Sequence, residues 1–101
     1  MEDEEFYREM LQTFLDSPSD TELIRFYEES DFENYRIKIH AVKTNLANIG
    51  AMKVSEMAKQ LELALKNDNN VSYVQEHHEE FMAAYDRVVS EVKTYIESAN
   101  T

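Results

Sequence analysis

Apolar residues recur along most of the chain at steps of three and four residues, which is the spacing that places them on one face of an α-helix. Five segments carry such a stripe, and turn or capping residues separate them. We expect helices at about residues 5–16, 18–30, 32–49, 53–66 and 71–97. The most regular stripe lies in the third helix and consists of Phe32, Tyr35, Ile39, Val42, Leu46 and Ile49.

Capping residues fall at the boundaries between these helices. Ser17-Pro18-Ser19-Asp20 supplies a cap, a proline suited to a first helical turn and an acid that favours the positive end of the helix dipole. Asp31 is placed to cap the third helix, and Gly50 follows the end of its stripe, where a left-handed C-terminal residue is expected. Asn67-Asp68-Asn69-Asn70 supplies the turn before the last helix.

Short connections between long helices place successive helices antiparallel to one another. The predicted fold class is therefore all-α, with an antiparallel four-helix bundle at about 18–98, an additional N-terminal helix at about 5–16, and a single domain over 1–101. Besides the stripe of the third helix, we expect the apolar faces to contain Phe6, Met10, Leu11, Phe14, Leu15, Leu23, Ile24, Tyr27, Val54, Met57, Ala58, Leu61, Leu65, Val74, His78, Phe81, Tyr85, Val88, Val92 and Tyr95.

Composition and charge narrow the function classes. The chain has 101 residues, 43% of them hydrophobic, which suits one compact core. Its 21 Asp and Glu against 10 Lys and Arg give a net charge of −11, which repels nucleic-acid phosphates and anionic lipids. We therefore expect neither nucleic acid nor a membrane as a partner. With no cysteine, an acidic N-terminus and no long apolar run, the chain is expected to be a cytoplasmic monomer.

Histidine is the side chain best suited to nucleophilic or proton chemistry near neutral pH, and the chain has three. His78 lies on the apolar stripe of the last helix and is expected to be a packed core residue, while His77 lies on a wetter face. The Glu-x-x-His spacing of di-metal bundles is absent, so metal catalysis is not expected. His40 remains as the candidate for chemistry.

His40 follows Ile39 on the most regular stripe, so it is rotated by about 100° from the buried edge and should reach solvent. Lys43 lies three positions on, close enough to meet a charged group attached to the imidazole. A phosphorylated histidine needs an accessible neutral nitrogen as nucleophile and a fixed cation near the phosphoryl oxygens. The alternative is an ordinary exposed histidine beside a lysine.

The string HAVKTNLANIGA, which begins at His40, resembles the histidine-containing phosphotransfer (HPt) domain. In that family the phosphorylated His is followed three positions later by Lys and ten positions later by Gly, often with Ala next, on the second helix of a four-helix bundle. His40, Lys43, Gly50 and Ala51 match these four positions. The resemblance extends through Leu61-Glu62 and covers about residues 18–98.

The resemblance implies a role for each matching residue. His40 would be the phosphorylated residue, Lys43 would stabilise the phosphoryl group, and Gly50 would be structural. Glu62 lies where family members often carry Glu or Gln, so it is a candidate to accept the Nδ1 proton of the imidazole and leave Nε2 as the nucleophile. The alternative for Glu62 is an exposed helix acid.

Lys59 and Lys66 flank Glu62 at three and four residues. They either add positive potential to the site or form ordinary helix pairs with Glu62.

Thr44 and Asn45 depart from the family pattern, in which glycine and a small residue are common. The threonine either narrows the approach to the ring or donates its hydroxyl to a phosphoryl oxygen. The exposed face near His40 carries a weakly charged set that we expect to be a docking patch for a partner. This set consists of Ile37, Ala41, Thr44 and Ala47, and the alternative is that Ile37 is a scattered exposed hydrophobe.

By resemblance, the partner is a receiver (response-regulator) domain, free or within a hybrid histidine kinase, whose aspartyl phosphate exchanges its phosphoryl group with His40. The chain has no glycine-rich phosphate loop and no ATP site, so we expect a phosphoryl carrier without a cofactor of its own, with Mg²⁺ on the receiver. Two alternatives stay open. One is an HPt-like module that docks a receiver or kinase without phosphotransfer, and the other is a helical adaptor unrelated to signalling.

Overall fold

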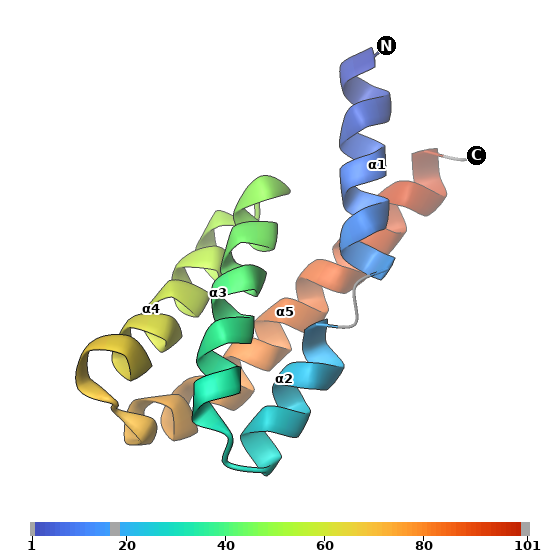
Figure 1. Ribbon diagram of the computed structural model, residues 1–101. Coiled ribbons are helices and arrows are strands. Elements are labelled where there is room, and N and C mark those ends of the chain that lie inside the picture. The colour runs from blue at the N-terminus through green and yellow to red at the C-terminus, as the bar shows by residue number, and fades with distance from the viewer. Residues whose placement is uncertain (1, 17–18, 100–101) are drawn as a thin grey trace.

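The computed structural model describes residues 2–16 and 19–99, and over these residues it consists of helices and short connections (Figure 1). The predicted all-α class is confirmed. The predicted cap at Ser17 and Pro18 lies outside the described residues. The helices are α1 (Glu2–Asp16), α2 (Ser19–Glu28), α3 (Phe32–Asn48), α4 (Met52–Asp68) and α5 (Val71–Ala99), so α1, α4 and α5 are each longer than their stripes predicted.

The helices pack in a chain of neighbours. α3 and α4 share the most extensive interface, α5 packs on α4, α2 packs on α3, and α1 contacts α5. Figure 1 shows α1 continuing past the ends of α3 and α4, on the side where α5 ends. The molecule is therefore elongated, with principal extents of 45 × 21 × 18 Å.

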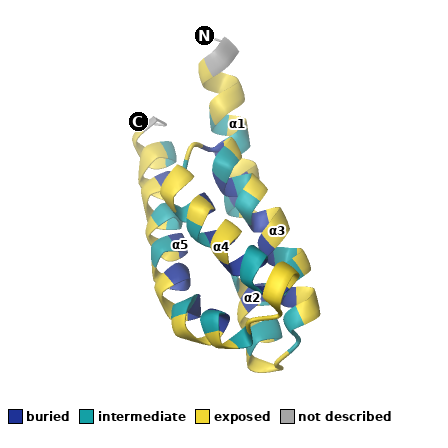
Figure 2. Ribbon diagram, turned by 90° about the vertical axis from the view of Figure 1, so that its left-hand side faces the viewer, coloured by how far each residue is buried: buried dark blue, intermediate teal, exposed yellow. Residues whose placement is uncertain are grey.

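The core lies where the stripes of all five helices meet. Figure 2 shows the buried residues turned toward the inside of the helices and exposed residues covering the outside. The most deeply buried side chains come from α2, α3, α4 and α5, and they are Leu23, Tyr35, Ile39, Leu46, Ala58, Val74 and Phe81, each at 0% exposure. The stripe of α3 is buried except for Phe32, which is half-buried.

Three residues predicted to face the core lie at the surface instead. Phe6 is 65% exposed and Tyr95 is 41% exposed, because α1 packs chiefly on α5 and the two helices leave much of their surface uncovered there. Ile24 is 40% exposed, because its neighbour Leu23 takes the inward position on the short helix α2. The stripe predicted which face of each helix is apolar, and neighbouring helices determine how much of that face is covered.

The two ends of α3 are capped as the sequence predicted. The Asp31 carboxylate accepts a hydrogen bond from the Asn34 N–H at 3.2 Å. Gly50 has a φ of +86°, its N–H donates to the Ala47 carbonyl at 3.0 Å, and the next N–H donates to the Leu46 carbonyl at 2.9 Å. This is the Schellman arrangement, and it turns the chain so that α4 returns along α3.

Candidate functional site

His40 lies midway along α3, next to the fully buried Ile39, and its own side chain is 60% exposed. The apolar stripe of α3 faces the core, and His40 follows Ile39 of that stripe. One residue corresponds to a rotation of about 100° around the helix, which turns His40 away from the core toward solvent. The imidazole therefore reaches the surface while the backbone that carries it belongs to the helix pair with the most extensive interface.

Glu62 lies on α4 directly across from His40 and Lys43. Its Oε2 is 2.5 Å from the Nδ1 of His40, and its Oε1 accepts a hydrogen bond from the Nζ of Lys43 at 2.7 Å. The Glu62 side chain is only 8% exposed. The alternative in which Glu62 is an exposed helix acid is therefore wrong, and each of its two oxygens has a partner.

Burial raises the pKa of the Glu62 carboxyl, because it penalises the charged form. The hydrogen bonds and positive charges of Lys43 and His40 act in the opposite direction and outweigh burial, so the pKa lies below its ordinary value. Glu62 is thus an ionised acceptor at neutral pH. A neutral His40 must then carry its proton on Nδ1, which leaves Nε2 with a free lone pair.

Ser55 fixes the register between α3 and α4, and no motif or apolar stripe in the sequence marks it. Its side chain is buried, and its Oγ donates to the backbone carbonyl of Lys43 at 2.9 Å. Ser55 lies seven residues before Glu62, so both face α3 from the same side of α4. The fully buried Ala58 between them keeps the two helices close. The only sequence signal for Ser55 is this spacing of two helical turns.

Thr44 lies one turn beyond His40 on the same exposed side of α3. Its Oγ1 donates to the backbone carbonyl of His40 at 3.3 Å. The hydroxyl is thus satisfied within α3, and donation to a phosphoryl oxygen would require its side chain to rotate.

The predicted docking patch is exposed over most of its length. Ile37 is 55% exposed, and Ala41 and Thr44 are exposed as well. Ala47 differs from the prediction, because it is half-buried. The structure therefore brings the first three together on the outer face of α3 beside His40, and Ala47 lies at the margin.

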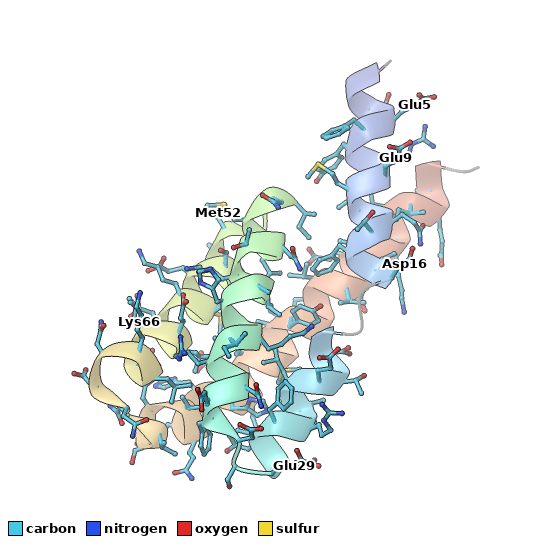
Figure 3. All side chains as sticks on the ribbon, viewed as in Figure 1. Glu5, Glu9, Asp16, Glu29, Met52 and Lys66 are labelled. Atoms are coloured by element: carbon cyan, nitrogen blue, oxygen red, sulfur yellow. The ribbon has the colours of Figure 1, made fainter. Side chains whose placement is uncertain are left out.

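Lys59 and Lys66 are both exposed on α4, and Lys66 projects from its last turn (Figure 3). Neither forms an ion pair with any described residue. The alternative in which they form helix pairs with Glu62 is therefore wrong, because His40 and Lys43 occupy that carboxylate.

The other two histidines are accounted for by packing. His78 is buried, as predicted, and its ring stacks on Tyr27 at a centroid distance of 3.8 Å. Burial lowers the pKa of His78, and the nearby Glu79 offsets this only in part, which favours a neutral ring. The Nδ1 of this ring is hydrogen-bonded to the Tyr35 hydroxyl at 2.9 Å. His77 is half-buried, with Nδ1 3.3 Å from Glu80.

Within residues 2–16 and 19–99, no group of three or more His, Cys, Asp or Glu side chains is arranged to hold a metal ion. In the same part of the chain, no helix has both the length and the apolar character needed to cross a bilayer. No family model, curated protein or solved structure matches the chain. Its function is therefore inferred from the geometry around His40.

Proposed function

We propose that the chain is a histidine-containing phosphotransfer module in which His40 accepts a phosphoryl group from the aspartate of a receiver domain and passes it on. The observation that carries this proposal is the buried Glu62 carboxylate, which contacts the Nδ1 of His40 with one oxygen and the Nζ of Lys43 with the other. This arrangement selects one ring nitrogen as the nucleophile and holds a cation beside it.

In the proposed reaction, the Nε2 of His40 attacks the phosphorus of the aspartyl phosphate. The Nε2–P bond forms, the bond between phosphorus and the aspartate oxygen breaks, and the aspartate leaves as a carboxylate. The Nδ1 proton stays on the ring, which becomes positively charged, and the Glu62 carboxylate offsets that charge. Because no proton has to leave the ring, the reverse transfer follows the same path.

Lys43 has the second role in the proposal. Its side chain is 26% exposed and its ammonium is anchored by Glu62, so it lies beside the imidazole at little additional cost in side-chain entropy. It would offset the charge of the phosphoryl oxygens after transfer. The chain supplies positioning and charge, and Mg²⁺ belongs to the receiver.

The helix arrangement agrees with this function. We assign α2 to α5 to the antiparallel four-helix bundle of the HPt family, with His40 on its second helix, and α1 to an additional N-terminal helix of the same single domain. The receiver would dock on the outer face of α3, over Ile37, Ala41 and Thr44.

The proposal is tested with phosphoramidate, a small donor that transfers its phosphoryl group to histidine and releases ammonia. We expect the wild-type protein to gain one acid-labile phosphoryl group and His40→Gln to gain none. The matched control is His77→Gln, which alters a half-buried histidine away from the site and should label like the wild type. Labelling is measured by intact mass and by ³¹P NMR.

The labelled protein is then mixed with the isolated receiver domains encoded in the same genome, and loss of label is followed over time. We expect at least one receiver to remove the group. Label that persists in His40→Gln would overturn the assignment of His40. A labelled wild-type protein that gives its group to none of the receivers would contradict the transfer function and leave a binding module.

A further inference from the structure

Positive charge is concentrated beside His40, although the chain as a whole has a net charge of −11. Arg36 lies four residues before His40 on α3, and Lys59 and Lys66 lie three residues before and four residues after Glu62 on α4. Since Glu62 contacts His40, all three side chains start within about one helical turn of the contact between the two helices. We call Arg36, Lys59 and Lys66 the cationic rim.

The ion pairs that the structure describes involve basic residues outside the cationic rim. Elsewhere Lys38 pairs with Glu22 at 3.6 Å, and in the site Lys43 pairs with Glu62. None of the three rim residues forms an ion pair with any residue the structure describes.

The two acids on α4 that lie within four residues of Lys59 are hydrogen-bonded to other side chains. Both oxygens of Glu62 have partners, and Glu56, three residues before Lys59, accepts a hydrogen bond from Gln60 at 2.9 Å. Within the described part of the chain the three rim residues thus lie near His40 without an ion-pair partner, and Lys59 and Lys66 are exposed to solvent, in a chain with about twice as many acids as bases.

The surface on the other side of His40 is different in character. Ile37, Ala41 and Thr44 carry no charge and are exposed on the outer face of α3. The surface around the imidazole thus has two sides, an uncharged one on α3 and a positive one toward α4. A partner that fits both sides can bind in only one orientation.

We propose that the cationic rim binds acidic side chains around the partner's phosphorylated aspartate and so orients the receiver over His40. This inference rests on the proposed function. A receiver that holds Mg²⁺ needs several carboxylates near its phosphorylated aspartate. A chain of net charge −11 repels such a surface at long range, so attraction near His40 requires a local reversal of the field.

The test compares two double variants of equal charge. Lys59→Glu/Lys66→Glu reverses the rim on α4, and Lys53→Glu/Lys93→Glu is the matched control. Lys53 is exposed on the opposite face of α4 from Glu62, and Lys93 is exposed on α5. Each Lys→Glu change subtracts two charges from −11, so both double variants have a net charge of −15.

Both variants and the wild type are first labelled with phosphoramidate and then mixed with the receiver that takes the group fastest from the wild type. We expect equal labelling of all three proteins. Transfer to the receiver should be about tenfold slower for the rim variant than for the control at low salt, and the difference should shrink as salt screens the charges. Circular dichroism verifies that both variants are folded.

Equal transfer rates for the rim variant and the control would overturn the inference while leaving His40 as the phosphoryl acceptor. Slower labelling of the rim variant by phosphoramidate, to the same degree as slower transfer, would also overturn it, because the rim would then bind the phosphoryl group and not the partner. Failure of the proposed function looks different, because the wild type itself then takes no label or passes none to a receiver.

Discussion

Glu62 joins the two residues that carry the proposed chemistry. Its buried carboxylate has one oxygen against the imidazole of His40 and the other against the ammonium of Lys43. A buried carboxylate that loses one partner keeps the desolvation penalty without the compensating contact. We therefore expect the site to contribute to stability as well as to the proposed chemistry, and the two effects can be separated by measuring both.

Lys43→Ala is expected to leave the fold intact and to lower the free energy of unfolding by about 1–2 kcal/mol, because one oxygen of Glu62 loses its partner. Labelling by phosphoramidate should become slower or the label less stable, since the cation beside the phosphoryl group is missing. Denaturant unfolding and ³¹P NMR measure the two effects. Lys53→Ala is the control, and unchanged labelling in Lys43→Ala would remove Lys43 from the site.

The α3–α4 hairpin holds the site at the scale of secondary-structure elements. The left-handed Gly50 reverses the chain, and the hydroxyl of Ser55 bonds the carbonyl of Lys43 two turns from Glu62. A shift of α4 along α3 by one turn, about 5.4 Å, would separate Glu62 from both partners. The register of this hairpin is therefore a condition for the geometry around His40.

Gly50→Ala is expected to lower the free energy of unfolding by about 1–2 kcal/mol, which is the cost of a left-handed conformation for a residue with a Cβ. Apart from Gly50 itself and its two chain neighbours, no residue has a heavy atom within 4 Å of the position that the Cβ would take, so the cost comes from the backbone. Thermal and urea unfolding measure this loss. Gly50→Asn should cost less, because asparagine tolerates this conformation, and an equal loss in both variants would contradict the explanation.

The helices and the exposure of His40 could be predicted from the sequence, because the period of a helix fixes which residues face the core. The burial of Glu62 could not be derived from that period. Glu62 lies at the edge of the apolar face of α4, and its burial results from partners on another helix. The hydrogen bond of Ser55 depends on the same pairing of α3 with α4. The spacing of apolar residues within one helix does not show which other helix it packs against, or in which register.

Three buried ionisable groups in different helices make the stability of the whole molecule depend on pH. The pKa of Glu62 is lowered by its partners despite burial, the pKa of His78 is lowered by burial, and the pKa of Tyr35 is raised by burial. His78 and Tyr35 are hydrogen-bonded to each other in the core, and Glu62 lies in the site. The fold thus favours an ionised Glu62, a neutral His78 and a protonated Tyr35.

We expect these three groups to give a plateau of stability between their ordinary pKa values of 6.5 for His78 and 10.0 for Tyr35. Below pH 6.5 the unfolded chain gains a proton on His78 that the folded chain excludes, so the free energy of unfolding decreases as the pH is lowered. Above 10.0 the unfolded chain loses the Tyr35 proton more easily, and stability falls again. The stability that ionised Glu62 contributes is present above pH 4.5, the ordinary pKa of the carboxyl, and is lost as the pH is lowered further.

Melting temperature measured against pH tests this expectation. In His78→Gln the decline that begins below pH 6.5 should disappear, while the decline that begins below pH 4.5 remains. The same decline below pH 6.5 in His78→Gln and the wild type would show that another group is responsible.

The 60% exposure of the His40 side chain bears on how long a phosphoryl group would last. Within residues 2–16 and 19–99, no segment covers the exposed side of the imidazole, so water as well as a receiver can reach it. Glu62 keeps the Nδ1 proton on the ring, and a ring that carries this proton is a good leaving group. The contact that prepares Nε2 for attack would therefore also shorten the lifetime of phosphohistidine against hydrolysis, so that the signal decays unless a receiver removes the group first.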